Sequence, residues 1–219
     1  MSTITLIRHG QANTAAQDEV SYDRLSDLGT QQAAWLGDHI RATGEHFERV
    51  YCGTLTRHVE TASAMQAETH AEIVQDNRLN EMEFFTLANL LRDQQDIPLP
   101  ASREEFVPYM PMLLSKWQSG GIAHPPESFQ EFENRVGSII VEISQGRGPA
   151  LVVTSGGLIG MVMRHVLGLD IPAFARSCIA IMNTSVHRLH RIGDDLALTQ
   201  FNAVPHLDHP DRQYAQTHL

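Results

Sequence analysis

The chain has 219 residues, a length that fits one large domain or one domain with an insertion. Hydrophobic residues make up 42 % of it, enough for a sizeable core, and the formal net charge is −10. This acidic balance favours a soluble protein and argues against broad contact with nucleic acid or with a membrane surface. The two cysteines provide no disulfide framework, and no apolar run approaches the ~18 residues that span a bilayer. Nothing at the start resembles a signal peptide, so we expect a cytoplasmic protein.

The first part of the chain predicts strands that alternate with helices. Apolar runs indicate strands at about Thr3–Arg8, Arg49–Cys52 and Glu72–Val74. Ser26 has the features of a helix N-cap, and Thr54 is expected to cap the helix that follows the second strand. This alternation predicts βαβ units and a largely parallel sheet.

Residues 84–126 interrupt the alternation. Prolines separate short helical pieces there, and aromatic and methionine side chains are frequent. We interpret the segment as a helical insertion that packs as a lid over the carboxyl edge of the sheet, where such segments often determine substrate choice. The alternative is an ordinary long connection between two elements.

The rest of the chain returns to regular elements. Ser128 and Glu131 form the pattern of a capping box at the start of a strongly periodic helix. Ala150–Thr154 is fully apolar, which is typical of a buried parallel strand, and it leads into a second apolar helix. Two further strands, about Ser185–Arg191 and Leu196–Ala203, are expected to form a hairpin.

These elements predict a three-layer α/β sandwich with a mostly parallel central sheet and helices on both faces. We expect a single domain over residues 1–219, with the helical insertion inside it. The polar tail beyond Pro205 is expected to be loosely held. Its histidines and aspartates lack the spacing of a metal site, so we expect no metal.

Three polar clusters follow predicted strands, at the ends that a parallel sheet brings to one edge. Arg8-His9-Gly10 follows the first strand, Arg57 lies early in the helix after the second, and Ser155-Gly156-Gly157 follows the apolar strand. Open α/β sheets bind ligands at this edge. Glycines let the backbone approach an anion, helix N-termini present free N–H groups, and arginines suit phosphate oxygens. The clusters therefore predict a phosphate site with a histidine nucleophile.

The same residues resemble a known family. Arg8-His9-Gly10, the run Leu55-Thr56-Arg57-His58-Val59-Glu60-Thr61 and Leu79-Asn80-Glu81 resemble the fingerprint of the histidine phosphatase superfamily, phosphoglycerate mutase-like branch. The order of strands and helices fits the fold of that family over most of the chain. The resemblance implies an enzyme without a cofactor, whose partner is a small phosphorylated molecule or phosphate. Dimers occur in families of this kind, so a homodimer stays open.

The resemblance also implies a role for each matching residue. His9 is expected to attack the phosphoryl group and form a phosphohistidine, which divides one difficult displacement into two easier ones. Arg8 and Arg57 are expected to hold the phosphoryl group and to offset its charge. Glu81 is expected to protonate the leaving oxygen and then to help activate water. Glu83 is the competing carboxylate, and Glu81 is favoured because it completes the family pattern.

The chain departs from the family at Ser155, where most members carry a second histidine. A histidinium is a charged donor and a serine hydroxyl a neutral one, and loss of a strong transition-state donor costs about 2.7–4 kcal/mol. Ser155 is expected to contact phosphate with help from the glycine N–H groups that follow, and Ser155→His to raise activity. His58 and His165 are alternative sources of the missing imidazole, although the sequence directs neither to the site.

The sequence thus predicts a phosphomonoesterase that acts through a phosphohistidine, with activity reduced by the serine. One alternative is a weakly active or inactive module that binds a phosphorylated ligand. A cofactor-dependent phosphoglycerate mutase is the other, and it is less favoured because a phosphoryl shuttle requires a site that is efficient in both directions.

Overall fold

A computed structural model describes residues 2–218 of the chain. Its centre is a six-stranded sheet in the order β3-β2-β4-β1-β5-β6. Neighbouring strands from β3 to β1 are parallel, whereas β5 runs antiparallel to β1 and to β6. The strands are β1 (Thr3–Arg8), β2 (Arg49–Cys52), β3 (Ile73–Gln75), β4 (Ala150–Thr154), β5 (Val186–Ile192) and β6 (Asp195–Ala203).

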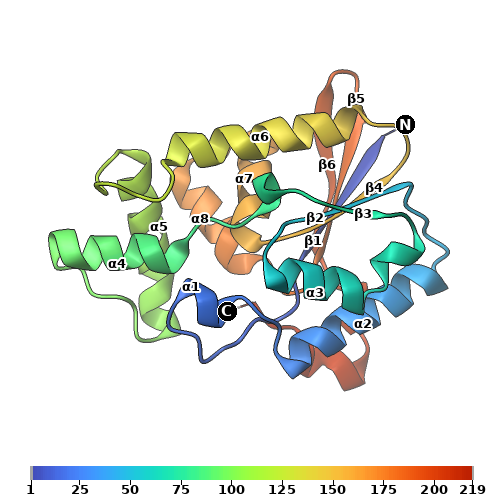
Figure 1. Cartoon of the computed structure of the whole chain (residues 1–219), viewed down its shortest axis with the longest axis horizontal. Coiled ribbons are helices and arrows are strands. Elements are labelled where there is room, and N and C mark those ends of the chain that lie inside the picture. Colours follow the sequence, from blue (N-terminus) through green and yellow to red (C-terminus); the bar gives the residue numbers. More distant parts are fainter. Residues whose placement is uncertain (1, 219) are drawn as a thin grey trace.

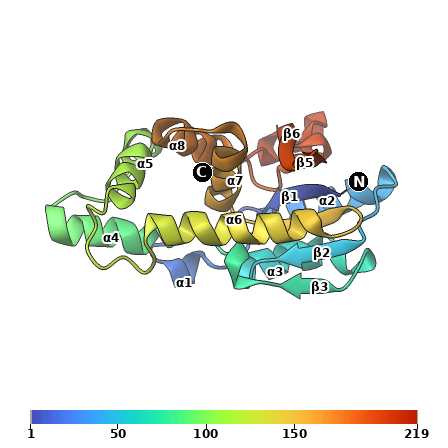
Figure 2. The ribbon, with the colours of Figure 1, turned by 90° about the horizontal axis from the view of Figure 1, so that it is seen from above.

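Helices cover both faces of this sheet, and two of them extend to one end of the molecule (Figure 1). Figure 2 shows from above that α4 and α5 lie at the end away from the β5–β6 hairpin. No helix within residues 2–218 is long and apolar enough to cross a membrane. The helices are α1 (Glu19–Tyr22), α2 (Asp27–Ala42), α3 (Thr56–Ala64), α4 (Phe84–Gln95), α5 (Arg103–Gln118), α6 (Phe129–Gln145), α7 (Gly156–Leu167) and α8 (Ile171–Ala180).

Alternate residues along the central strands face opposite helical layers, as the two-residue period of a strand requires. In β1, Ile4 and Leu6 belong to the large core that includes α6 and α7. Ile7 instead packs in the second core, with residues of α2 and α3. Val152 and Val153 of β4 divide between the two cores in the same way. The three-layer α/β fold with a mostly parallel sheet is therefore confirmed.

Two predicted helix starts are confirmed in atomic detail. The Ser26 hydroxyl accepts the Gly29 N–H at 3.0 Å at the start of α2. Ser128 and Glu131 form the predicted capping box of α6, with each side chain bonded to the backbone of the other residue. Local polar spacing therefore fixed where both helices begin.

The predicted cap of α3 is wrong. Leu55 occupies the N-cap position without a side-chain bond, and Thr54 instead exchanges two hydrogen bonds with Asn80 at 2.7 Å. The free N–H groups of α3 are bonded by the Asp23 carboxylate, which accepts from Thr56 at 2.9 Å and from Arg57 at 3.2 Å. A cap supplied by a distant residue leaves no signal in the local sequence.

The predicted loose tail is also wrong. Beyond Pro205 the chain forms two short 3-10 helices, Pro205–Leu207 and Pro210–Ala215. Leu207 and Ala215 are fully buried in a small cluster that also includes Leu28 and Trp35 of α2. The tail covers an apolar part of α2, and this burial holds a segment whose own composition is polar.

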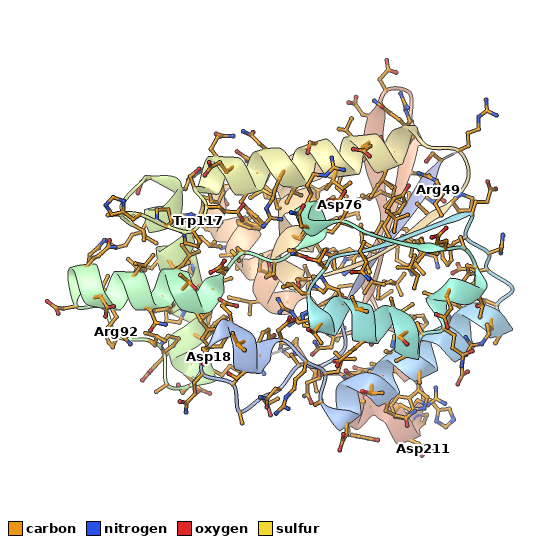
Figure 3. The ribbon with its side chains drawn as sticks, in the orientation of Figure 1. Asp18, Arg49, Asp76, Arg92, Trp117 and Asp211 are labelled. Atoms are coloured by element: carbon orange, nitrogen blue, oxygen red, sulfur yellow. The ribbon has the colours of Figure 1, made fainter. Side chains whose placement is uncertain are left out.

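Residues 84–126 contain α4 and α5 rather than a series of short pieces, and α5 continues through Pro108 and Pro111. Trp117, labelled in Figure 3, joins α5 to α6: its ring centroid lies 5.3 Å from that of Phe129 and 5.5 Å from that of Phe132. Its indole N–H also donates to a backbone carbonyl. This packing holds α5 against the large core despite the backbone bonds that its prolines remove.

Candidate active site

The ends of β1, β2 and β4 meet at one cavity of about 530 Å³. Its inner wall includes four residues singled out from the sequence, together with the glycines at the start of α7. Parts of α1, α4, α5 and α8, together with loops next to them, form the rest of the wall. Those inner-wall residues are Arg8, His9, Arg57, Glu81, Gly156 and Gly157. The parallel sheet thus brings together residues that are up to 149 positions apart, from 8 to 157.

His9 follows β1 directly, and its backbone N–H donates to the Thr154 carbonyl of β4 at 2.8 Å. Its Nδ1 lies 2.7 Å from the Gly10 carbonyl oxygen, which can only accept, so Nδ1 carries the proton. The lone pair is therefore on Nε2. Burial lowers the pKa of His9 well below its usual value, and the charges of Arg57 and Arg8 add to this effect. The result is a neutral imidazole with a free nitrogen in the cavity wall.

Arg57 is fixed in place by two residues of the segment after His9. Its Nη1 donates to the Asp23 carboxylate at 3.0 Å, and the guanidinium carbon lies 5.1 Å from the centre of the Tyr22 ring. The arginine side chain is almost completely buried, whereas Asp23 is partly exposed. A buried guanidinium held on one side by a carboxylate keeps its remaining donors available to an anion.

Arg8 is partly engaged by backbone oxygens. Its Nη1 donates to the carbonyl of Ile181 and, at 2.9 Å, to the carbonyl of His218. Its Nε is buried and has no hydrogen-bond partner among residues 2–218. The guanidinium therefore keeps a donor for an anion at the cavity wall, close to the start of α7.

Glu81 lies at the N-terminus of α7. Its carboxylate accepts the Gly157 N–H at 2.8 Å and the Met82 N–H at 3.0 Å. A Cβ at Gly157 would lie only 2.3 Å from Glu81 Oε1, so this contact requires glycine. Glu83 is exposed, accepts the hydroxyl of Thr86 and does not line the cavity. Of the two carboxylates considered from the sequence, only Glu81 lies at the cavity.

Ser155 occupies the N-cap position of α7 and is fully buried, but it is not part of the cavity wall. Its hydroxyl lies 2.6 Å from Nε2 of His58, whose ring centroid is 5.7 Å from that of His9. His165, the other alternative, is half-buried, with its Nε2 3.7 Å from Glu133. A direct phosphate contact by Ser155 stays a prediction, while the His58 ring lies beside that of His9.

Three further polar residues of the cavity wall were missed in the sequence. Glu19 accepts the Phe85 N–H at 2.7 Å, and burial raises the pKa of its carboxyl. The Tyr22 ring lies at 83° to that of His9, with the two ring centroids 6.3 Å apart. Asn183 donates to the His9 carbonyl at 3.3 Å. All three come from segments without strong periodicity, and only their packing around His9 identifies them. Among residues 2–218 no group of three histidine, cysteine or acidic side chains is arranged to hold a metal ion.

Known proteins are similar to this chain over most of its length. Residues 4–204 match the histidine phosphatase superfamily (branch 1). A 2,3-bisphosphoglycerate-dependent phosphoglycerate mutase of Rhizobium etli is 24 % identical over 216 residues, which cover 91 % of this chain and 95 % of the mutase. The fold is similar to that of phosphoglycerate mutase from Bacillus anthracis, with a TM-score of 0.70, 20 % identity and 94 % of each chain covered. Phosphoserine phosphatase from Entamoeba histolytica gives a TM-score of 0.69 at 18 % identity, with 94 % of this chain and all of that chain covered.

Proposed function

Because the chain belongs to the histidine phosphatase superfamily (branch 1), we propose that it is a phosphomonoesterase that acts through a phosphohistidine at His9. The observation that carries the proposal is the bond from His9 Nδ1 to the Gly10 carbonyl, which leaves Nε2 as the nucleophilic nitrogen. Burial keeps this imidazole neutral, as a nucleophile must be.

In the first step, the lone pair of His9 Nε2 forms a bond to phosphorus while the bond from phosphorus to the ester oxygen breaks. Arg57 and the free Nε of Arg8 offset the negative charge of the phosphoryl oxygens. Glu81 gives a proton to the leaving oxygen, so the product leaves as a neutral alcohol.

In the second step, water attacks the phosphohistidine. Glu81, now a carboxylate, takes a proton from this water as the new oxygen–phosphorus bond forms and the nitrogen–phosphorus bond breaks. Inorganic phosphate leaves, and His9 returns to its neutral form with Nδ1 still bonded to Gly10. One carboxyl therefore serves both half-reactions, as acid and then as base.

The outer part of the cavity favours an ester with an apolar or aromatic leaving group. Apart from Arg103 and the polar residues beside it, the outer part of the cavity presents mainly hydrophobic side chains. Such a wall stabilises a ring or hydrocarbon by burial and offers little to a second charged group. The side chains concerned are Phe84, Phe85, Leu99, Phe106, Met110 and Ile179.

Hydrolysis of p-nitrophenyl phosphate by the purified chain tests the proposal, with vanadate as inhibitor. Brief reaction with 32P-labelled substrate and acid quench is expected to trap an acid-labile phosphoenzyme that is absent in His9→Ala. Phenyl phosphate is expected to be a better substrate than phosphoserine or 3-phosphoglycerate. Absence of both turnover and phosphoenzyme across this panel would contradict an esterase.

One observation favours a second candidate, a module that binds a phosphorylated ligand without efficient turnover. Two backbone carbonyls already occupy Nη1 of Arg8, which reduces its capacity to stabilise a transition state. Calorimetric binding of phosphate without hydrolysis would support this candidate. The mutase relative suggests a third assay, in which 3-phosphoglycerate and 2,3-bisphosphoglycerate are supplied together.

A further inference from the structure

His58 is a buried imidazole that the proposed chemistry does not use. It lies on α3 next to Arg57, is completely inaccessible to solvent, and reaches across to the first residue before α7. Its Nε2 is 2.6 Å from Ser155 Oγ, and its Nδ1 has no hydrogen-bond partner among residues 2–218. Burying an imidazole costs free energy unless its nitrogens are hydrogen-bonded, so the burial of the His58 ring requires an explanation.

The surroundings of His58 provide space for this ring. A Cβ at Gly53 would lie 2.1 Å from His58 Nδ1, so only glycine leaves room there. Burial lowers the pKa of His58 well below its usual value, with a further contribution from Arg57. The neutral ring donates from Nε2 to Ser155, because the other tautomer would bury an unpaired Nδ1–H.

The Ser155 hydroxyl likewise has no hydrogen-bond partner other than His58 among residues 2–218. A serine at an N-cap normally accepts a backbone N–H of the first turn, yet its hydroxyl makes no such bond here. The Glu81 carboxylate takes the Gly157 N–H instead. The Ser155 hydroxyl is thereby free for His58, so helix capping does not explain the residue.

We propose that His58 and Ser155 form a positioning pair for the phosphoryl site. Their hydrogen bond fixes α3, which carries Arg57, against the start of α7, which carries the Gly156 and Gly157 wall of the cavity. The His58 ring also packs beside His9, 5.7 Å away between ring centroids. The pair thus connects α3, the start of α7 and the segment that carries His9.

This role rests on the proposed phosphatase function and predicts a specific kinetic effect. A displacement of about 1 Å in a catalytic constellation can cost about 100-fold in rate. Loss of the pair is therefore expected to lower kcat and the affinity for vanadate, which both depend on the phosphoryl site. The KM for p-nitrophenyl phosphate is expected to change less, because the outer wall binds the aromatic ring.

A double-mutant cycle on the full chain tests the contact. His58→Leu and Ser155→Ala are each expected to lower kcat by about 10- to 100-fold, and the double variant no further than the worse single variant. His58→Gln, whose amide can donate in place of Nε2, is expected to recover at least tenfold over His58→Leu. The matched control is His187 with Ser185, a buried pair 2.9 Å apart outside the cavity wall. Substitutions of this control pair are expected to lower Tm but to leave kcat within about twofold.

An exchange of the two residues is the sharpest test. Ser155→His alone is expected to lower activity, because a second imidazole does not fit beside the His58 ring. His58→Ser together with Ser155→His moves the imidazole across the same contact, and is expected to recover at least tenfold over Ser155→His alone.

The outcomes separate this inference from the phosphatase proposal. An active wild type whose cycle is additive, or whose exchange variant is no better than Ser155→His, overturns the positioning pair and leaves the phosphatase intact. A fall in Tm without a fall in kcat or vanadate affinity also overturns it. A wild type that neither turns over substrate nor binds vanadate in calorimetry overturns both.

Discussion

Asp23 offers a direct test of how the site is assembled, because one carboxylate serves both the start of α3 and the guanidinium of Arg57. It accepts the Thr56 N–H at 2.9 Å, the Arg57 N–H at 3.2 Å and Arg57 Nη1 at 3.0 Å. Loss of a helix cap costs about 1 kcal/mol, and loss of a hydrogen bond to a charged group about 1.5–3 kcal/mol. Because Asp23 is partly exposed, solvent reduces the second contribution.

Asp23→Ala is therefore expected to lower the free energy of unfolding by about 2–3 kcal/mol, given these two contributions. For a domain of this size that corresponds to a fall in Tm of about 4–12 °C in calorimetry. The same variant is expected to lower kcat/KM for p-nitrophenyl phosphate by about 100-fold, because Arg57 loses its orientation.

Two further variants separate the roles of Asp23. Asp23→Asn keeps an oxygen for the α3 N–H groups but removes the charge, so it is expected to retain most of the stability and little of the activity. Asp170→Ala removes a comparable cap, the bond to the Ala173 N–H at 2.8 Å at the start of α8, with no arginine involved. It is expected to lower Tm and leave kcat/KM within about twofold. Full activity in Asp23→Ala would refute the reasoning.

Three other predictions concern proton transfer, space and pH. Glu81→Gln is expected to lower kcat/KM, which reports phosphoenzyme formation, about 100-fold or more with phenyl phosphate and much less with p-nitrophenyl phosphate, whose leaving group needs no proton. If Glu19→Gln shows that pattern instead, the roles are exchanged. Gly157→Ala places a Cβ 2.3 Å from Glu81 Oε1 and is expected to lower kcat about 10- to 100-fold, and Gly156→Ala far less. Burial lowers the pKa of His187 to about 3, whereas the usual pKa of a histidine is about 6.5. Between these two pH values the residue binds a proton in the unfolded chain but not in the folded one. Stability is therefore expected to fall by about 2 kcal/mol from this residue between pH 7 and pH 5, and urea denaturation of His187→Leu should show a correspondingly smaller pH dependence.

The neighbourhood of Ser155 shows where sequence reasoning stops. From the sequence, Ser155 is a weak substitute for a histidine, and Ser155→His is expected to raise activity. The packing reverses that expectation, because the His58 ring already fills the space beside the serine hydroxyl. His58 and Ser155 are 97 positions apart, and no local pattern connects two residues that meet only when α3 packs beside α7.

The tail and the Asp23 cap have the same physical origin. Thr54 has the local features of a cap, yet the α3 N–H groups bind a carboxylate 33 and 34 positions away. The tail is polar by composition, yet Leu207 is fully buried against α2. In both places the contact comes from a residue far away in the sequence. A distant carboxylate bonds the α3 N–H groups, and a distant leucine packs against the apolar side chains of α2.

The sequence by itself determined the alternation of strands and helices, the mostly parallel sheet and the inner-wall residues Arg8, His9, Arg57 and Glu81. It could do so because strand and helix periods and helix caps are local, and parallel strands deliver their carboxyl ends to one edge. Only the tertiary structure decided which nitrogen of His9 is free, that Asp23 orients Arg57, and that His58 is bonded to Ser155. Those features depend on distances between segments that are far apart in the chain, and the packing of the whole fold sets such distances.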